Sequence, residues 1–226
     1  MVSIAATGDQ LLDTSLGIVN REWLSDDLMG LSHVPPSEIK WVFDLGSGDG
    51  SWSKVATTYA PDARVLAVDW RRHAVAAVEN CLYAAIGDEE TIWVPTGITI
   101  RNMNPIVNMC AVKGVTFARL LEENAVTPKQ TVVRYQGSAN ALSSILNSIE
   151  GLRMLTVIFY GGPELVGKIL TTLKEHFETM TAEKKGDVFY VKCYNEGFAV
   201  RNVRWDGLGG VSDCDAAGDE SVDHQP

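Results

Sequence analysis

The stretch WVFDLGSGDGSWSKVA, from Trp41 to Ala56, decides the fold. It begins with an apolar run typical of a buried strand, which ends in Leu45 just after Asp44. Glycines follow at every second position, and the chain then becomes polar and helix-like. Because ligands bind beyond the carboxyl ends of strands in an open parallel sheet, and because glycine lets the backbone turn tightly there, the stretch predicts a strand, a ligand-binding turn and a helix.

Strand-like and helix-like segments alternate along the chain. Apolar runs rich in Val, Ile, Phe and Tyr predict strands at 40–45, 64–70, 131–137, 152–160 and 187–194. Apolar residues at helical spacing predict helices at 52–59, 73–86, 140–150 and 164–180. The alternation predicts an α/β fold with a mostly parallel sheet.

An additional segment, about 91–128, separates the second and third predicted strands. It contains TIWVPTGITI, whose Pro-Thr-Gly turn predicts a small hairpin, and then NMCAVKGVTFARLLEENAV, which predicts a helix. We therefore expect one domain, 1–205, that carries this insertion. The remaining residues, 206–226, form an acidic tail without Lys or Arg and with few bulky apolar residues, a composition typical of disorder.

The composition fits one full-sized domain, because 226 residues with 46% hydrophobic content can bury a complete core. The net charge of -10 argues against a broad nucleic-acid-binding surface. Six of the acidic residues lie in the tail, however, so the rest of the chain is only mildly acidic and a local basic face for RNA is possible.

The cysteines, the apolar runs and the first ten residues indicate the cellular compartment that we expect for the protein. The four cysteines are scattered and form no CxxC pair, so neither a zinc site nor a disulfide framework is expected. We expect no membrane segment, because no window holds 18 uninterrupted apolar residues, and no signal peptide, because the first ten residues lack basic residues. These features predict a reduced, cytoplasmic environment.

A second marker of a ligand site is Asp69, which closes the strand after the glycine turn. A carboxylate there can accept hydrogen bonds from both hydroxyls of a ribose. A dinucleotide fingerprint would be GxGxxG facing a pyrophosphate, whereas here Asp49 stands in the turn and would repel phosphate. S-adenosylmethionine (SAM) has no phosphate and carries a positive sulfonium, so it fits an acid-flanked glycine loop better. The alternative is a structural turn that binds no ligand.

At this point the residues resemble a known family. VFDLGSGDGSWS resembles motif I of class I SAM-dependent methyltransferases, and its DLGxGxGxWS form resembles the FtsJ/RrmJ-like RNA ribose 2'-O-methyltransferases, including the flavivirus-type cap enzymes. GDVFYVKCYNEGF resembles the fifth-strand motif of that family, and YQGSA lies where its third strand ends beside the adenine. The resemblance covers roughly 20–200.

This resemblance implies a Rossmann-like methyltransferase fold, SAM as the cofactor and RNA as the methyl acceptor. It further implies a viral mRNA-capping context and therefore the host cytoplasm. The cofactor-binding residues that it implies are Asp44, Gly46, Ser47, Gly48, Gly50, Ser51, Trp52, Asp69, Trp70 and Ser138.

The catalytic residues of the family are matched only in part. Its members use a Lys-Asp-Lys-Glu tetrad that stabilises the developing alkoxide of the ribose, and Lys192 matches the second lysine. At the expected position of the aspartate the chain has Tyr160, which could donate a hydrogen bond near the transfer point. The first lysine and the glutamate have no counterpart, and Arg21 is the cation nearest to the position of that lysine.

Three functions therefore remain open. An RNA methyltransferase predicts a basic strip at the carboxyl ends of the strands, with Arg71, Arg72, Arg201 and Arg204 as candidate RNA contacts beside Lys192. A catalytically inactive structural or protein-binding domain predicts a site blocked by side chains such as Trp52 or Trp70. A small-molecule or protein methyltransferase predicts a closed apolar pocket covered by the insertion.

Overall fold

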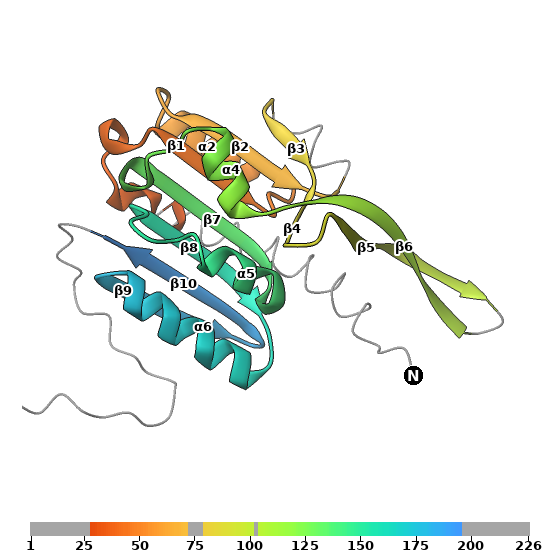
Figure 1. The fold of residues 1–226 in the computed structure, drawn as a ribbon. Coiled ribbons are helices and arrows are strands. Elements are labelled where there is room, and N and C mark those ends of the chain that lie inside the picture. Colours follow the sequence, from red (N-terminus) through yellow and green to blue (C-terminus); the bar gives the residue numbers. More distant parts are fainter. Residues whose placement is uncertain (1–27, 72–78, 102–103, 196–226) are drawn as a thin grey trace, which may run out of the picture.

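Seven described strands form the central sheet of the protein, whose computed structural model describes residues 28–71, 79–101 and 104–195 (Figure 1). Their order is β3-β2-β1-β7-β8-β10-β9. The parallel strands are β1 (Trp41–Leu45), β2 (Arg64–Asp69), β3 (Cys81–Tyr83), β7 (Thr131–Ser138) and β8 (Met154–Tyr160). β10 (Val188–Tyr194) runs antiparallel between β8 and β9 (Thr179–Lys185). The predicted α/β fold with a mostly parallel sheet is confirmed.

Helices cover both faces of this sheet, as Figure 1 shows. On one face lie α4 (Phe117–Glu123), α5 (Ala139–Leu146) and α6 (Pro163–His176), and on the other lie α2 (Ser51–Tyr59) and the 3-10 helix η1 (Leu28–His33). The short 3-10 helices η2 (Pro36–Glu38) and η3 (Pro128–Gln130) precede β1 and β7. Because central strands are covered on both sides, β8 is buried without interruption from Met154 to Phe159, which explains its continuous apolar sequence.

The predicted helix at 73–86 is wrong for the residues that the structure describes there. Cys81–Tyr83 form β3, which pairs with β2, and Ala85–Ile86 form β4, which pairs with β6. Residues 72–78 lie outside the described residues. Pairing with neighbouring strands outweighs the local helical pattern, because propensity is a weak preference that tertiary contacts override.

The insertion also differs from its prediction. TIWVPTGITI is a single strand, β5 (Thr91–Arg101), and its Pro-Thr-Gly sequence makes an irregularity between Pro95 and Gly97 instead of a reversal. Its partner is β6 (Asn104–Val115), so the predicted helix is a strand up to Val115 and a helix only in α4. With β4, these strands form a second sheet of order β4-β6-β5.

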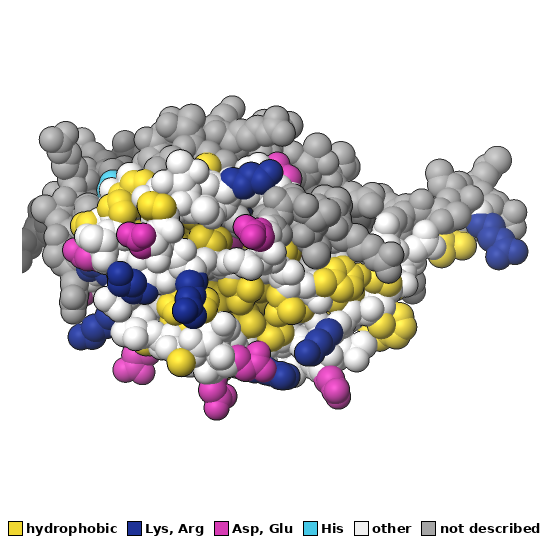
Figure 2. All heavy atoms as spheres, turned by 90° about the horizontal axis from the view of Figure 1, so that it is seen from above, with side chains coloured by type: hydrophobic (Ala, Val, Ile, Leu, Met, Phe, Trp, Pro, Cys, Tyr) yellow, Lys and Arg dark blue, Asp and Glu magenta, His cyan; other side chains and the backbone are white. Residues whose placement is uncertain are grey.

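We call β5 (Thr91–Arg101) and β6 (Asn104–Val115) together the arm. It projects from the body of the protein on the side where the parallel strands end (Figure 1, Figure 2). Its base packs on the body through Val94 and Val112, which are buried with Ala85. No helix among the described residues is long and apolar enough to cross a membrane.

Candidate cofactor site

The glycine turn lies between β1 and α2 and takes a left-handed backbone at each glycine. The φ angles are +79° at Gly46, +62° at Gly48 and +73° at Gly50. A Cβ atom on Gly46 would lie 2.2 Å from the carbonyl oxygen of Gln136, so the turn passes directly against β7. Among the described residues, a Cβ on Gly48 would meet only Arg71, at 3.6 Å. The glycines therefore serve both close packing, at Gly46, and open access, at Gly48.

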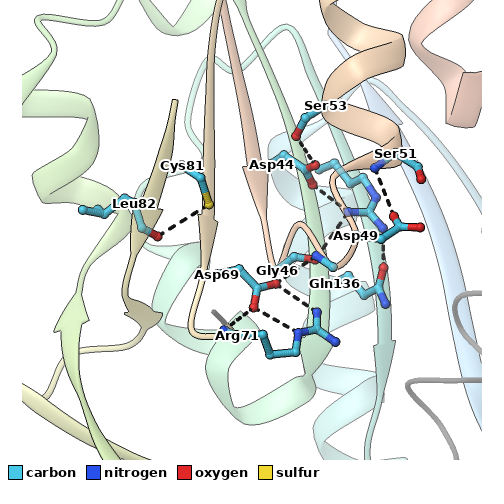
Figure 3. A network of polar contacts seen from close by, with 12 residues as sticks. Asp44, Gly46, Asp49, Ser51, Ser53, Asp69, Arg71, Cys81, Leu82 and Gln136 are labelled. Carbon is cyan, nitrogen blue, oxygen red and sulfur yellow. Dashed lines mark hydrogen bonds and ion pairs between the residues drawn. The ribbon is translucent and has the colours of Figure 1, made fainter. Parts of the chain in front are cut away.

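Asp69 ends β2 beside this turn and joins it by a hydrogen bond. Its Oδ2 accepts from the backbone N–H of Gly48 at 2.9 Å. Its carboxylate also accepts from Arg71, from the backbone N at 2.7 Å, Nε at 3.0 Å and Nη2 at 2.9 Å (Figure 3). The predicted ribose-binding carboxylate is thus positioned at the glycine turn, and in this structure it is held by a guanidinium.

Asp44 forms a second ion pair beneath the turn. Its side chain is fully buried and accepts from Arg134 Nη1 at 2.6 Å and from Ser53 Oγ at 2.5 Å. Arg134 lies opposite Asp44 in the register of β1 and β7 and also donates to Gln136 (Figure 3). The pair fixes the first turn of α2 to two strands. It also offsets the charge of Asp44, since a buried carboxylate requires a partner.

The other predicted residues of the turn differ in burial. Ser47 is buried, and Trp52 is buried in the core with its ring 5.9 Å from the Arg134 guanidinium carbon. Ser51 donates its backbone N–H to Asp49, and Gly50 precedes the first residue of α2. The side chain of Trp52 therefore packs beneath the turn and does not block the space above it.

A cavity of about 240 Å³ opens at the carboxyl ends of the parallel strands. The predicted residues that line it are Gly46, Asp69, Trp70, Ser138 and Tyr160. Apolar side chains from Ile86 and from Ile92, Val94 and Pro95 at the base of the arm form another wall. Mainly apolar walls with a few polar groups are typical of small-molecule sites. The remaining predicted cofactor residues, and Lys192, do not line this cavity.

The ends of β7 and β8 contribute polar groups to the cavity. Ser138 accepts from the backbone N–H of Ala141 as the N-cap of α5, and its carbonyl accepts from Tyr135 Oη at 2.8 Å. Burial raises the pKa of Tyr135, and the nearby Tyr160 raises it further. Tyr135 therefore stays protonated and acts as a hydrogen-bond donor.

Lys192 does not lie where the fifth-strand prediction places it. Because β10 is antiparallel, Lys192 pairs with Thr156 in the middle of β8, whereas Val188 pairs with Tyr160 at the carboxyl end. Four residues of strand separate Lys192 from that edge, a distance of about 13 Å. Its side chain lies near Gly30 of η1. The strand direction assumed for this prediction was wrong, and the geometry gives Lys192 no place at the cavity.

The sequence analysis missed several residues at the site. Tyr135 and Gln136 line the cavity, and Arg134 anchors the turn beneath it. One signal was available: an arginine within the apolar run TVVRYQG requires a buried carboxylate as partner. Of the predicted RNA contacts, Arg71 lines the cavity, whereas Arg72, Arg201 and Arg204 lie outside the described residues.

Comparisons with known proteins find solved structures of low sequence identity and low structural similarity. No protein-family model and no curated protein matches the sequence. A precorrin-6y methyltransferase from Geobacter metallireducens GS-15 is 13% identical over 72% of this chain and 86% of that chain, with a TM-score of 0.40. The fibrillarin pre-rRNA processing protein of Methanococcus jannaschii is 12% identical over 72% and 69%, with a TM-score of 0.42. Human N-acetylserotonin methyltransferase, solved with SAM, is 11% identical over 81% and 55%, with a TM-score of 0.43.

Proposed function

We propose that the protein is a SAM-dependent methyltransferase that binds its cofactor at the glycine turn and the adjoining cavity. The observation that carries the proposal is the junction of the turn with Asp69, whose carboxylate accepts from Gly48 at the rim of the cavity. Asp69 is placed to accept the ribose hydroxyls once Arg71 turns away. Ile86, Ile92 and Val94 offer apolar contact to the adenine, and the open space above Gly48 suits the amino-acid portion.

The acceptor that we propose is RNA, at a cap, a ribose 2'-hydroxyl or a base. Bound SAM would supply an electrophilic methyl group. Among the described residues that line the cavity, Asp69 is the sole carboxylate, and it is held by Arg71. A nucleophile that needs positioning and little proton transfer, such as a ring nitrogen of guanine, fits this set of residues better than a ribose hydroxyl. Tyr160, at the end of β8, is the residue placed to orient it.

Calorimetric titration with SAM tests the cofactor site. The wild type is expected to bind with micromolar affinity, Gly48→Arg to lose binding by filling the open space, and Asp69→Ala to weaken it about tenfold or more by removing charged hydrogen-bond acceptors. Gly186→Arg is the matched control, because Gly186 has φ +60° and open space around it in the turn between β9 and β10. Equal binding by Gly48→Arg and wild type would exclude the turn as the site.

A second candidate is a domain that binds no cofactor and serves as a structural or protein-binding module. The observation that favours it is that two of the three carboxylates at the turn, Asp44 and Asp69, are held by arginines. A folded wild-type protein that gives no heat with SAM would support this second function.

A further inference from the structure

The arm differs in charge from the rest of the chain. From Thr91 to Val115 the sequence contains two cations, Arg101 and Lys113, and no acidic residue, although the whole chain has a net charge of -10. The acidic residues Asp88, Glu89 and Glu90 end just before the arm begins. Figure 2 shows basic and hydrophobic side chains, and no acidic ones, on the described part of the projecting end. The arm is therefore a positively charged projection on an acidic protein.

The arm also carries most of the exposed large apolar side chains of the described residues. Trp93 is 64% exposed, Met109 47% and Ile106 45%, while Tyr83 on β3 is the remaining one, at 38%. Most of the indole surface of Trp93 therefore contacts solvent and does not pack in the core. A single exposed aromatic ring beside a cation offers a stacking surface for an unpaired base.

Trp93 and Lys113 lie on the same face of the arm. In the register of β5 and β6, Trp93 is opposite Ala111 and Thr91 is opposite Lys113, so Trp93 and Lys113 are diagonal neighbours. Diagonal neighbours of this kind lie about 7–8 Å apart, within reach of long side chains. Both residues, with Ala111, are exposed, and they define what we call the outer face of the arm.

The outer face lies next to the candidate cofactor site. Ile92 and Val94, on either side of Trp93 in β5, line the cavity from the opposite face of the same strand. An RNA strand that lies across the outer face at Trp93 is therefore separated from the cavity by β5. Arg101 is exposed at the far end of β5, but the irregularity between Pro95 and Gly97 places it, with its partner Asn104, on the opposite face of the arm from Trp93.

We propose that the outer face of the arm binds single-stranded RNA, with a base stacked on Trp93 and a phosphate at Lys113. Charge complementarity favours a polyanion over an apolar protein partner, because the arm has cations and lacks acids. A free base face favours a single strand over a duplex, in which bases are stacked on each other. The inference rests on the proposed function only in naming the RNA as the methyl acceptor, since RNA binding to the arm needs no cofactor.

The test is binding of a fluorescein-labelled single-stranded RNA, followed by anisotropy at several salt concentrations, with the full chain. Trp93→Ala should weaken binding about tenfold or more, and Trp93→Phe should restore most of the affinity, because base stacking needs an aromatic face. Met109→Ala, on the same arm, removes apolar area without an aromatic ring and should change affinity less than threefold. Lys113→Gln should lower the slope of log K against log salt by about 0.7.

Lys129→Gln is the charge control, because Lys129 is exposed in η3, just before the start of β7 and therefore at the opposite end of the strands from the arm. It should leave the affinity and the salt slope unchanged. Wild-type affinity in both Trp93→Ala and Lys113→Gln would overturn the proposal. Equal losses in Met109→Ala and Trp93→Ala, with an unchanged salt slope, would assign the face to a protein partner instead. Titration of the same variants with SAM keeps the two proposals apart: RNA binding without SAM binding contradicts the cofactor site alone, and SAM binding without RNA binding contradicts the arm alone.

Discussion

At the scale of single residues, two arginines hold the carboxylates of Asp44 and Asp69 beside the glycine turn, and the two ion pairs differ in burial. Arg134 has a side chain 3% exposed and joins Asp44 in the interior, whereas the side chain of Arg71 is 16% exposed and joins Asp69 at the rim of the cavity. The buried pair is part of the framework of the turn. The pair at the rim competes with any ligand that uses the same carboxylate.

Replacement of Arg71 by Met should therefore strengthen the binding of SAM. The ribose hydroxyls would no longer have to displace a guanidinium from Asp69, and a partly exposed ion pair of this kind contributes about 1 kcal/mol, or about fivefold in affinity. Calorimetric titration measures the change. Arg153→Met is the control, because Arg153 pairs with Glu38 at 2.7 Å away from the cavity, and it should leave affinity unchanged. Weaker binding by Arg71→Met would mean that the guanidinium itself holds the ligand.

Replacement of Arg134 by Met should destabilise the protein strongly. It leaves the carboxylate of Asp44 buried without its charged partner, a change that typically costs about 3–5 kcal/mol of unfolding free energy. Asp44→Asn combined with Arg134→Met removes both charges and should recover much of that loss. Urea unfolding of both single variants and the double variant measures the coupling. Additive losses in the double variant would show that the two side chains do not stabilise each other.

At the scale of elements, the sequence predicts best where burial is complete. β1, β2, β7 and β8 follow continuous apolar runs, and the glycine turn is visible because three alternate glycines have few other uses. β9 is missed because the helical pattern of α6 runs on beyond His176. Gly186 and Asp187 are a turn signal in the sequence, and Gly186 has φ +60°. The turn at these residues reverses the chain, so β10 runs antiparallel to β9. Because this turn was missed, the direction of β10 was predicted wrongly, and so was the position of Lys192 along the sheet.

The arm shows a second limit of the sequence at this scale. Pro-Thr-Gly is a turn signal, yet here it lies inside β5, because the register of β5 with β6 absorbs it as an irregularity. The sequence likewise gives no sign that Ile92 and Val94 meet residues from β2, β7 and β8 at one cavity. Contacts of this kind arise between segments far apart in the chain. By contrast, the buried Arg134 could have been paired with Asp44 from charge alone.

At the scale of the whole molecule, the candidate site joins two sheets. The central sheet supplies the glycine turn, Asp69 and the ends of β7 and β8, while the arm supplies a wall through Ile92 and Val94. A ligand in this cavity would therefore hold the arm to the body. Elements that do not reach the cavity, such as β9, should not respond.

Hydrogen exchange of the full chain with and without SAM tests this coupling. SAM should slow exchange at the end of β2, at the end of β7 and at Ile92–Val94, because a ligand that binds the folded site suppresses local opening there. β9 and the second half of α6 should exchange as before. Gly48→Arg at the same SAM concentration is the control and should show no protection at any of these segments. Protection of β2 and β7 without the base of the arm would place the ligand on the central sheet alone, and the arm would then move independently of the cofactor.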